Sequence, residues 1–78
     1  MQRFFFHLYD DVVTLDEEGV ELFDLHAAKH QAMKGARSIA CAQLTSGKLS
    51  LHHRIEVEDQ NHRPVYSLPF KDAFTIEA

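Results

Sequence analysis

The chain is 78 residues long, is 45% hydrophobic, and has a formal net charge of −4 and a single cysteine. This length supports one small domain, residues 1–78, and the apolar content excludes a disordered chain. One cysteine cannot form an intramolecular disulfide, and no stretch approaches the ~20 apolar residues of a membrane-spanning helix. We therefore expect a soluble cytoplasmic protein that does not enter membranes. Because a core of this size contributes only about 3–5 kcal/mol, we also expect a homo-oligomer, a dimer before any larger assembly.

Charge is distributed unevenly along the chain. Residues 10–24 hold seven of the twelve acidic residues and no Lys or Arg. No Asp or Glu lies between Leu25 and Ile55, and that stretch holds five Lys or Arg residues. Segregation of this kind reflects binding more often than folding, although it does not identify a partner.

The first part of the chain predicts strands and a turn. Residues 3–9 are aromatic and are followed by two aspartates, which is typical of a strand with both faces covered. Residues 12–15 predict a second short strand, and residues 20–23 an extended or irregular segment. Between them, residues 16–19 form an acidic turn in which Gly19 can adopt a positive φ.

A long helix is predicted over residues 24–46. Asp24 is a suitable N-cap, and Gly47 suits the position just beyond the C-cap. Gly35 inside the helix lacks a side chain, which favours close packing. Between the caps, apolar residues recur at spacings of three and four and form one stripe, consisting of Leu25, Ala28, Ala32, Ala36, Ile39, Ala40 and Leu44.

The last part predicts a hairpin. Residues 49–58 alternate between apolar and polar side chains, as in a strand with one buried face. Residues 65–70 are its expected partner, held at an edge by Pro64 and Pro69, and residues 71–76 are expected to add a helical turn with Phe74 packed inward. The predicted fold is therefore ββ-α-ββ, an α+β two-layer sandwich in which a mostly antiparallel four-stranded sheet carries one long helix on one face.

The sheet face without a helix is one candidate interaction surface. Phe5, His7 and Tyr9 point toward it, and an exposed aromatic patch would suit a second subunit. Alternatively, neighbouring Arg and Lys stems cover these rings. A neutral His7 could donate a hydrogen bond to a partner.

The segregated charges form another candidate surface. The acidic turn of one subunit could meet the basic helix of a second one, or the charges are simply solvated. The cations could also meet phosphates, but a pI of about 5.8 and the lack of interleaved aromatics argue against nucleic acid. The charged candidates are Asp16, Glu17 and Glu18 in the turn, and Lys34 and Arg37, which lie with His26 and His30 on the outward side of the helix.

Catalytic and metal-binding patterns are weak. His26 and His30 have the i, i+4 spacing of a metal pair, but no third ligand has a supporting spacing, so we expect solvated histidines and no metal or cofactor. Cys41 lies on the outward side of the helix without an activating neighbour. The chain has three glycines and neither a Gly-x-Ser-x-Gly elbow nor a phosphate-binding loop. We expect no enzymatic activity.

Four segments in order resemble a family of small bacterial proteins known only as a domain of unknown function. They are RFFFH at residues 3–7, DEEGVEL at 16–22 with the helix entry at 24–28, RIEV at 54–57 and LPF at 68–70. That family usually has a glycine between residues 10 and 16, where this chain has Asp11-Val12-Val13, so the first turn is expected to differ. The resemblance implies a compact stand-alone module and nothing catalytic.

The first half of the chain is also loosely similar to HicB-type antitoxins of toxin–antitoxin pairs. An aromatic first strand, an acidic turn with glycine and an alanine-rich helix follow one another there as well. The main hypothesis is thus a non-enzymatic protein-interaction module that self-associates. The alternative is an antitoxin-like or nucleic-acid-associated regulator.

Overall fold

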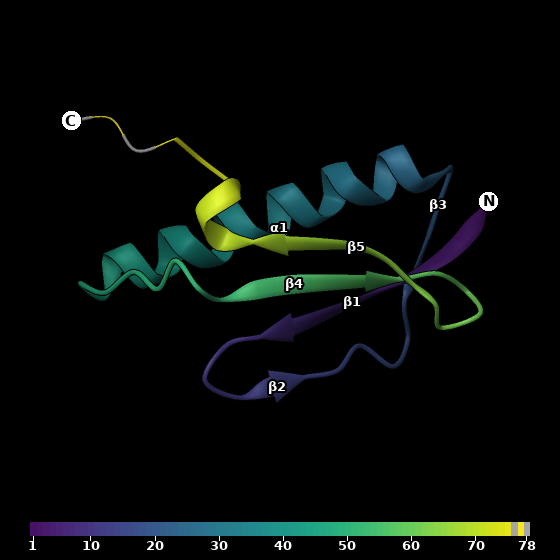
Figure 1. The fold of residues 1–78 in the computed structure, drawn as a ribbon, viewed down its shortest axis with the longest axis horizontal. Coiled ribbons are helices and arrows are strands. Elements are labelled where there is room, and N and C mark those ends of the chain that lie inside the picture. Colours follow the sequence, from purple (N-terminus) through teal and green to yellow (C-terminus); the bar gives the residue numbers. More distant parts are fainter. Residues whose placement is uncertain (76, 78) are drawn as a thin grey trace.

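The structure, a computed structural model, describes residues 1–75 and 77. Within these residues one helix packs along one face of an antiparallel sheet, which confirms the predicted α+β fold with two layers (Figure 1). The sheet has five strands rather than four, in the order β2-β1-β4-β5 with β3 also paired to β1. The elements are β1 (Gln2–Tyr9), β2 (Val13–Thr14), β3 (Val20–Leu22), α1 (Leu25–Thr45), β4 (Arg54–Glu58), β5 (Pro64–Pro69) and the 3₁₀ turn η1 (Phe70–Asp72).

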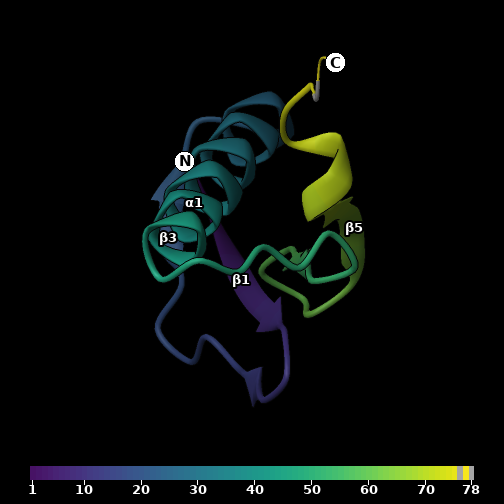
Figure 2. The same cartoon turned by 90° about the vertical axis from the view of Figure 1, so that its left-hand side faces the viewer.

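Strand β1 is paired along both edges. On one edge, β4 pairs with its residues 5–9. On the other edge, β3 pairs with residues 2–4, and β2 pairs with Leu8 and Tyr9. Strands β2 and β3 therefore share one edge in succession, and residues 15–19 between them leave the sheet. Figure 2 shows this connection on the side of β1 away from α1.

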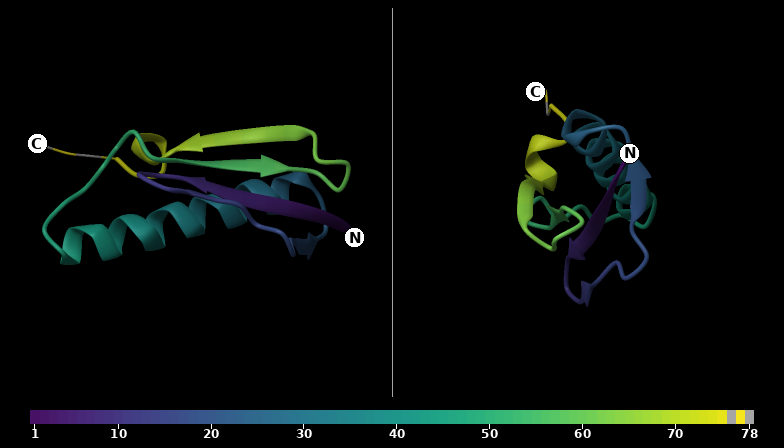
Figure 3. Two further views of the ribbon diagram at one scale, coloured as in Figure 1. Left: turned by 90° about the horizontal axis from the view of Figure 1, so that it is seen from below. Right: turned by 90° about the vertical axis from the view of Figure 1, so that its right-hand side faces the viewer.

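The helix begins and ends where the sequence predicts. The Asp24 side chain accepts a hydrogen bond from the Ala27 amide at 2.9 Å, and Ser46 is the C-cap. Gly47 follows with φ of 90°. Leu44, which was expected in the buried stripe, is 60% exposed because the last turns of α1 reach past the end of the sheet (Figure 3). Within the described part of the chain, no helix combines the length and apolarity needed to cross a bilayer.

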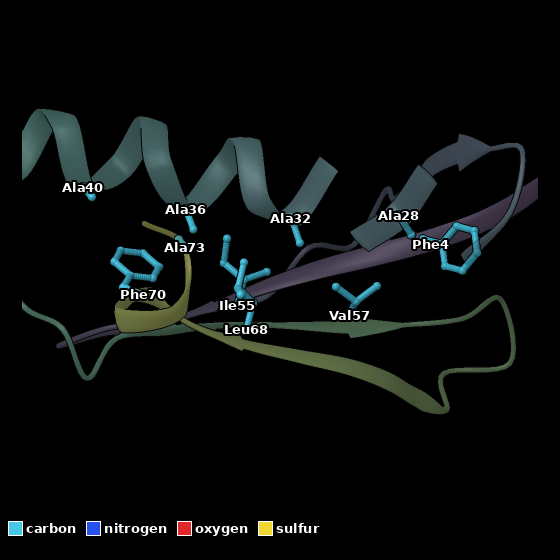
Figure 4. Packing of buried hydrophobic residues seen from close by; sticks show 10 residues of the cluster. All are labelled: Phe4, Ala28, Ala32, Ala36, Ala40, Ile55, Val57, Leu68, Phe70 and Ala73. Atoms are coloured by element: carbon cyan, nitrogen blue, oxygen red, sulfur yellow. The ribbon is translucent and has the colours of Figure 1, made fainter. Parts of the chain in front are cut away.

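The core is a row of alanines facing larger side chains. Ala28, Ala32, Ala36 and Ala40 are all buried on one side of α1. Their small size lets the helix approach the sheet closely, so that the bulk of the core comes from the strands. Figure 4 shows the opposing residues of the cluster, which are Phe4, Ile55, Val57, Leu68, Phe70 and Ala73.

The predicted strand over residues 49–58 is wrong in its first half, because β4 begins only at Arg54. The carbonyls of Leu51 and His53 accept hydrogen bonds from the amides of Lys71 and Phe70, so this segment joins η1 and does not extend the ladder with β1. Ser50, which was expected on the wet face, is buried.

The last helical turn also differs from the prediction. It is a 3₁₀ turn at Phe70–Asp72 in place of residues 71–76, and Phe74 is half-buried beside the core. Ile76, the end of the predicted turn, lies outside the described residues.

Gly35→Ala is expected to stabilise the protein. Gly35 lies in mid-helix, and a Cβ there would meet Ile55 Cδ1 at 3.6 Å, an ordinary contact. The added side chain should therefore raise the free energy of unfolding by about 0.5–1 kcal/mol, measured by urea denaturation.

Gly47→Ala is the matched control. No atom of the described residues lies within 4 Å of a Cβ at Gly47, but its φ of 90° disfavours any side chain. The same substitution should there lower stability by about 1–2 kcal/mol. Equal effects at the two positions would contradict this assignment of their backbone conformations.

Candidate functional site

The sheet face opposite α1 contains a hollow of about 500 Å³. Its floor is formed by side chains of β1. Its walls are the loop of residues 15–19 and the turn that joins β4 to β5. The lining residues are His7, Tyr9, Leu15, Asp16, Glu17, Glu58 and His62.

The Asp16 carboxylate holds the first wall in place. Its Oδ1 accepts hydrogen bonds from the amides of Glu18 at 3.2 Å and Gly19 at 3.0 Å, which closes the turn. Its Oδ2 accepts from the Phe6 amide at 3.1 Å. That amide lies where β2 and β3 leave the edge of β1 unpaired, so the side chain replaces a strand partner.

Gly19 permits this loop to lie against β1. Its φ is 71°, and a Cβ would stand 2.9 Å from the Phe4 carbonyl oxygen and 3.0 Å from the Phe5 ring. Both the backbone conformation and the close approach therefore require glycine.

Hydrogen bonding keeps Asp16 ionised. Burial raises the pKa of its carboxyl group, but the amides of Gly19, Phe6 and Glu18 lower it further than burial raises it, with a smaller lowering by His7. The pKa of Asp16 is therefore lower than the ordinary value for an aspartate.

His7 is buried at the floor of the hollow, with both ring nitrogens bonded. Nδ1 accepts from the Asp16 amide at 3.0 Å. The proton of the neutral ring is therefore assigned to Nε2, which donates to Glu58 Oε1 at 2.8 Å. These two bonds fix the tautomer and orientation of the imidazole.

Glu58 links His7 to the second wall. The hydrogen bond from His7 lowers the pKa of Glu58, burial opposes this, and His62 lowers it again, leaving the pKa below its ordinary value. His62 has a φ of 61° and stacks its ring on Phe5 with centroids 4.6 Å apart. The carboxylates around the hollow make it suited to a positively charged group.

The structure brings four predicted site residues together. His7, Tyr9, Asp16 and Glu17 all line the hollow. Phe5 lies beside it but is only 7% exposed, because His62 and Gly19 cover its ring.

The exposed aromatic patch expected on this face is therefore covered within the chain. At Tyr9, the Arg54 guanidinium lies 4.3 Å from the ring centroid, which matches the alternative of arginine stems over the rings. Glu18 is exposed, and its carbonyl accepts from Arg3 Nη1 at 2.6 Å.

The predicted helix residues lie on the other side of the molecule. Lys34, His26 and His30 are exposed on α1. Arg37 is also exposed, but its Nε donates to the Ala73 carbonyl at 2.6 Å. Within residues 1–75 and 77, no three His, Cys, Asp or Glu side chains gather closely enough to hold a metal ion.

Glu58 and His62 line the hollow but were not predicted from the sequence as site residues. Glu58 is 51 positions from His7, and the two meet because β1 and β4 are antiparallel neighbours, with Phe5 opposite Glu58. The alternating pattern did place Glu58 on the wet face of its strand. It could not tell which strand would lie next to it.

The fold and the hollow define a small α+β domain with a charged site on its open sheet face. The family model for the Domain of unknown function (DUF6894) matches residues 3–71, and the chain belongs to this family. The resemblance to an uncharacterised small domain is thereby confirmed. No curated protein and no solved structure matches the chain.

Asp16→Asn is expected to destabilise the protein by roughly 1–3 kcal/mol, because hydrogen bonds to a charged acceptor are lost and an amide group replaces one of the two acceptor oxygens. The measurement is chemical denaturation at neutral pH. Glu18→Gln, an equal change of charge at an exposed neighbour, should leave the stability within about 0.5 kcal/mol of wild type.

The same carboxylate should contribute to acid sensitivity. The pKa of Asp16 is lower in the folded than in the unfolded chain. The carboxylate therefore contributes to folding stability above its unfolded pKa of about 3.9, and this contribution is lost as the pH falls through its folded pKa. Stability should therefore decline below about pH 4, and less steeply in Asp16→Asn than in wild type. Identical acid profiles would show that Asp16 does not carry this contribution.

Proposed function

We propose that this protein is a small, non-enzymatic interaction module that self-associates through opposite charges. The acidic loop, residues 15–19, lies on one side of the sheet, and the helix lies on the other (Figures 1 and 2). The basic helix face consists of His26, His30, Lys34 and Arg37. In the proposed dimer the acidic loop of one copy contacts the basic helix face of the other.

Charges left unpaired within the chain carry this proposal. In the described part of the chain, Glu17, Glu18 and Lys34 form no ion pair, and all three are exposed. A second copy supplies the missing partner for either surface. Because the two surfaces lie on opposite sides of the molecule, the contact is heterologous, and a further copy could add at either end.

The hollow adds a specific binding site for a cationic side chain to the acidic surface. Asp16, Glu17 and Glu58 surround it, and the lowered pKa values of Asp16 and Glu58 keep both groups anionic at neutral pH. A lysine or arginine side chain has the charge and the length to enter such a depression. Lys34 of a second copy is the proposed occupant.

The strength of this association is limited. Exposed ion pairs contribute about 0.2–1 kcal/mol each and are weakened by salt. Several pairs are needed for a dimer, and its dissociation constant should rise steeply with ionic strength. With Phe5 covered, the exposed groups of the loop on this face are the carboxylates of Glu17 and Glu18 and the apolar side chain of Leu15, so charge and this leucine provide the affinity.

Two features support a non-enzymatic role. Both nitrogens of His7 are occupied, by the Asp16 amide and by Glu58, so this ring has no free base to offer a substrate. Cys41 is exposed on α1, away from the residues that line the hollow.

The antitoxin-like or nucleic-acid-associated role uses the same basic helix face. The looser HicB-type similarity and the exposed cations on α1 support it. In that case a phosphate backbone or a toxin, and not a second copy, would neutralise Lys34.

Mixing two charge-reversed variants tests the dimer. Glu17→Lys with Glu18→Lys makes both surfaces basic, and His30→Glu with Lys34→Glu makes both acidic. Each variant alone should be monomeric, and an equimolar mixture should form a heterodimer. Sedimentation velocity in about 0.05 M and about 0.5 M NaCl measures this, with association expected at the lower salt.

Wild-type protein that stays monomeric at high concentration and low salt would overturn self-association. A heterodimer that forms equally well in high salt would overturn its electrostatic origin. Retention of the wild-type protein on RNA in low salt, lost in His30→Glu with Lys34→Glu, would favour the regulator in its place.

A further inference from the structure

A second hollow, separate from the proposed dimer contacts, lies at the C-terminal end of α1. It has a volume of about 190 Å³ and is bounded by the end of the helix, the turn after β1 and the segment before β4. Its lining residues are Asp11, Gln43, Ser46, Lys48, Ser50 and His53.

His53 presents an unsatisfied donor to this hollow. The Gln43 carbonyl oxygen accepts from the Ser50 amide at 3.2 Å, which orients the side-chain amide. The Gln43 nitrogen therefore donates to His53 Nδ1 at 3.1 Å, and the proton of the neutral ring is assigned to Nε2.

None of the described residues hydrogen-bonds Nε2, although the His53 side chain is only 6% exposed. The ring cannot easily turn away, because Phe70 and His52 pack edge-on against it. A buried donor without an acceptor is destabilising and points to a missing partner.

The carboxylate of Asp11 indicates which kind of group can lie opposite His53 Nε2. Its Oδ1 stands 3.6 Å away, too far for a hydrogen bond. The Asp11 side chain is 80% exposed in the turn after β1, so it is free to move aside. Lys48, Ser46 and Ser50 add a cation and two hydroxyl groups to the lining.

We propose that this hollow binds the carboxylate group of a small molecule. The ligand displaces Asp11, accepts a hydrogen bond from His53 Nε2 and places its charge near Lys48. At the ~30 Å³ that a water molecule occupies in the liquid, the hollow has room for about six non-hydrogen atoms. A short carboxylic acid of that size is the class of ligand that fits.

A metal ion is a poorer match for the same hollow. It would need the lone pair of Nε2, whereas the bond from Gln43 to Nδ1 leaves the proton on Nε2. The site therefore favours an acceptor over a cation.

Acetate titration followed by NMR of the His53 ring and the Ser50 amide tests this proposal. Wild-type protein should show saturable shifts with a dissociation constant of about 1 mM or weaker, as expected for so small a ligand. Asp11→Asn should tighten binding severalfold by removing the competing carboxylate, and Lys48→Met should weaken it severalfold.

Glu18→Gln, an equal change of charge on the acidic loop at a position that does not line this hollow, should leave acetate binding unchanged. Sodium chloride at matched ionic strength should not reproduce the shifts. Shifts that grow linearly with acetate, or equal affinities in wild type and Asp11→Asn, would overturn the proposal and leave Asp11 and His53 as an internal pair. Saturable binding of inorganic phosphate without binding of acetate would overturn the choice of carboxylate.

Discussion

The open side of this sheet depends on the Asp16 carboxylate. It accepts three backbone hydrogen bonds, two from its own turn and one from the unpaired amide of Phe6. The loop is thereby tied to β1 where β2 and β3 leave the edge unpaired. The Asp16 amide continues the network by setting the tautomer of His7, whose other nitrogen reaches Glu58 on β4. One side chain thus organises a surface drawn from three separate parts of the chain.

This arrangement also explains how a chain of 78 residues covers both faces of a sheet with one helix. The alanine row brings α1 close to one face, where Phe4, Val57, Leu68 and Phe70 are fully buried. The other face is covered at Phe5 by His62 and Gly19, which come from two loops. Because the loops do this within one chain, an apolar partner is not required there. The groups that remain for recognition on this face are charged side chains and the exposed Leu15.

The periodic parts of the fold could be predicted from the sequence. The bounds of the helix follow from Asp24 and Gly47, and its buried face from alanines at regular spacing, because both depend on residues close in sequence. The start of β4 could not be predicted, since residues 49–53 alternate like a strand but bond to η1. The partners of His7 could not be predicted either, because they too depend on contacts between residues far apart in the sequence. Local pattern sets which face a side chain occupies, whereas strand pairing sets what it meets.

Two buried histidines, His7 and His53, share one arrangement of hydrogen-bonding groups, but only His7 forms both of its hydrogen bonds. In each, Nδ1 accepts a hydrogen bond and the Nε2 proton points toward a carboxylate. For His7 the carboxylate is Glu58, which is fixed by the pairing of β4 with β1, and the distance is 2.8 Å. For His53 it is Asp11, which lies in an exposed turn 3.6 Å away. A carboxylate held by a strand cannot easily be exchanged, but one held by a turn can. The difference between these two distances therefore separates a structural histidine from one whose acceptor can come from outside the chain.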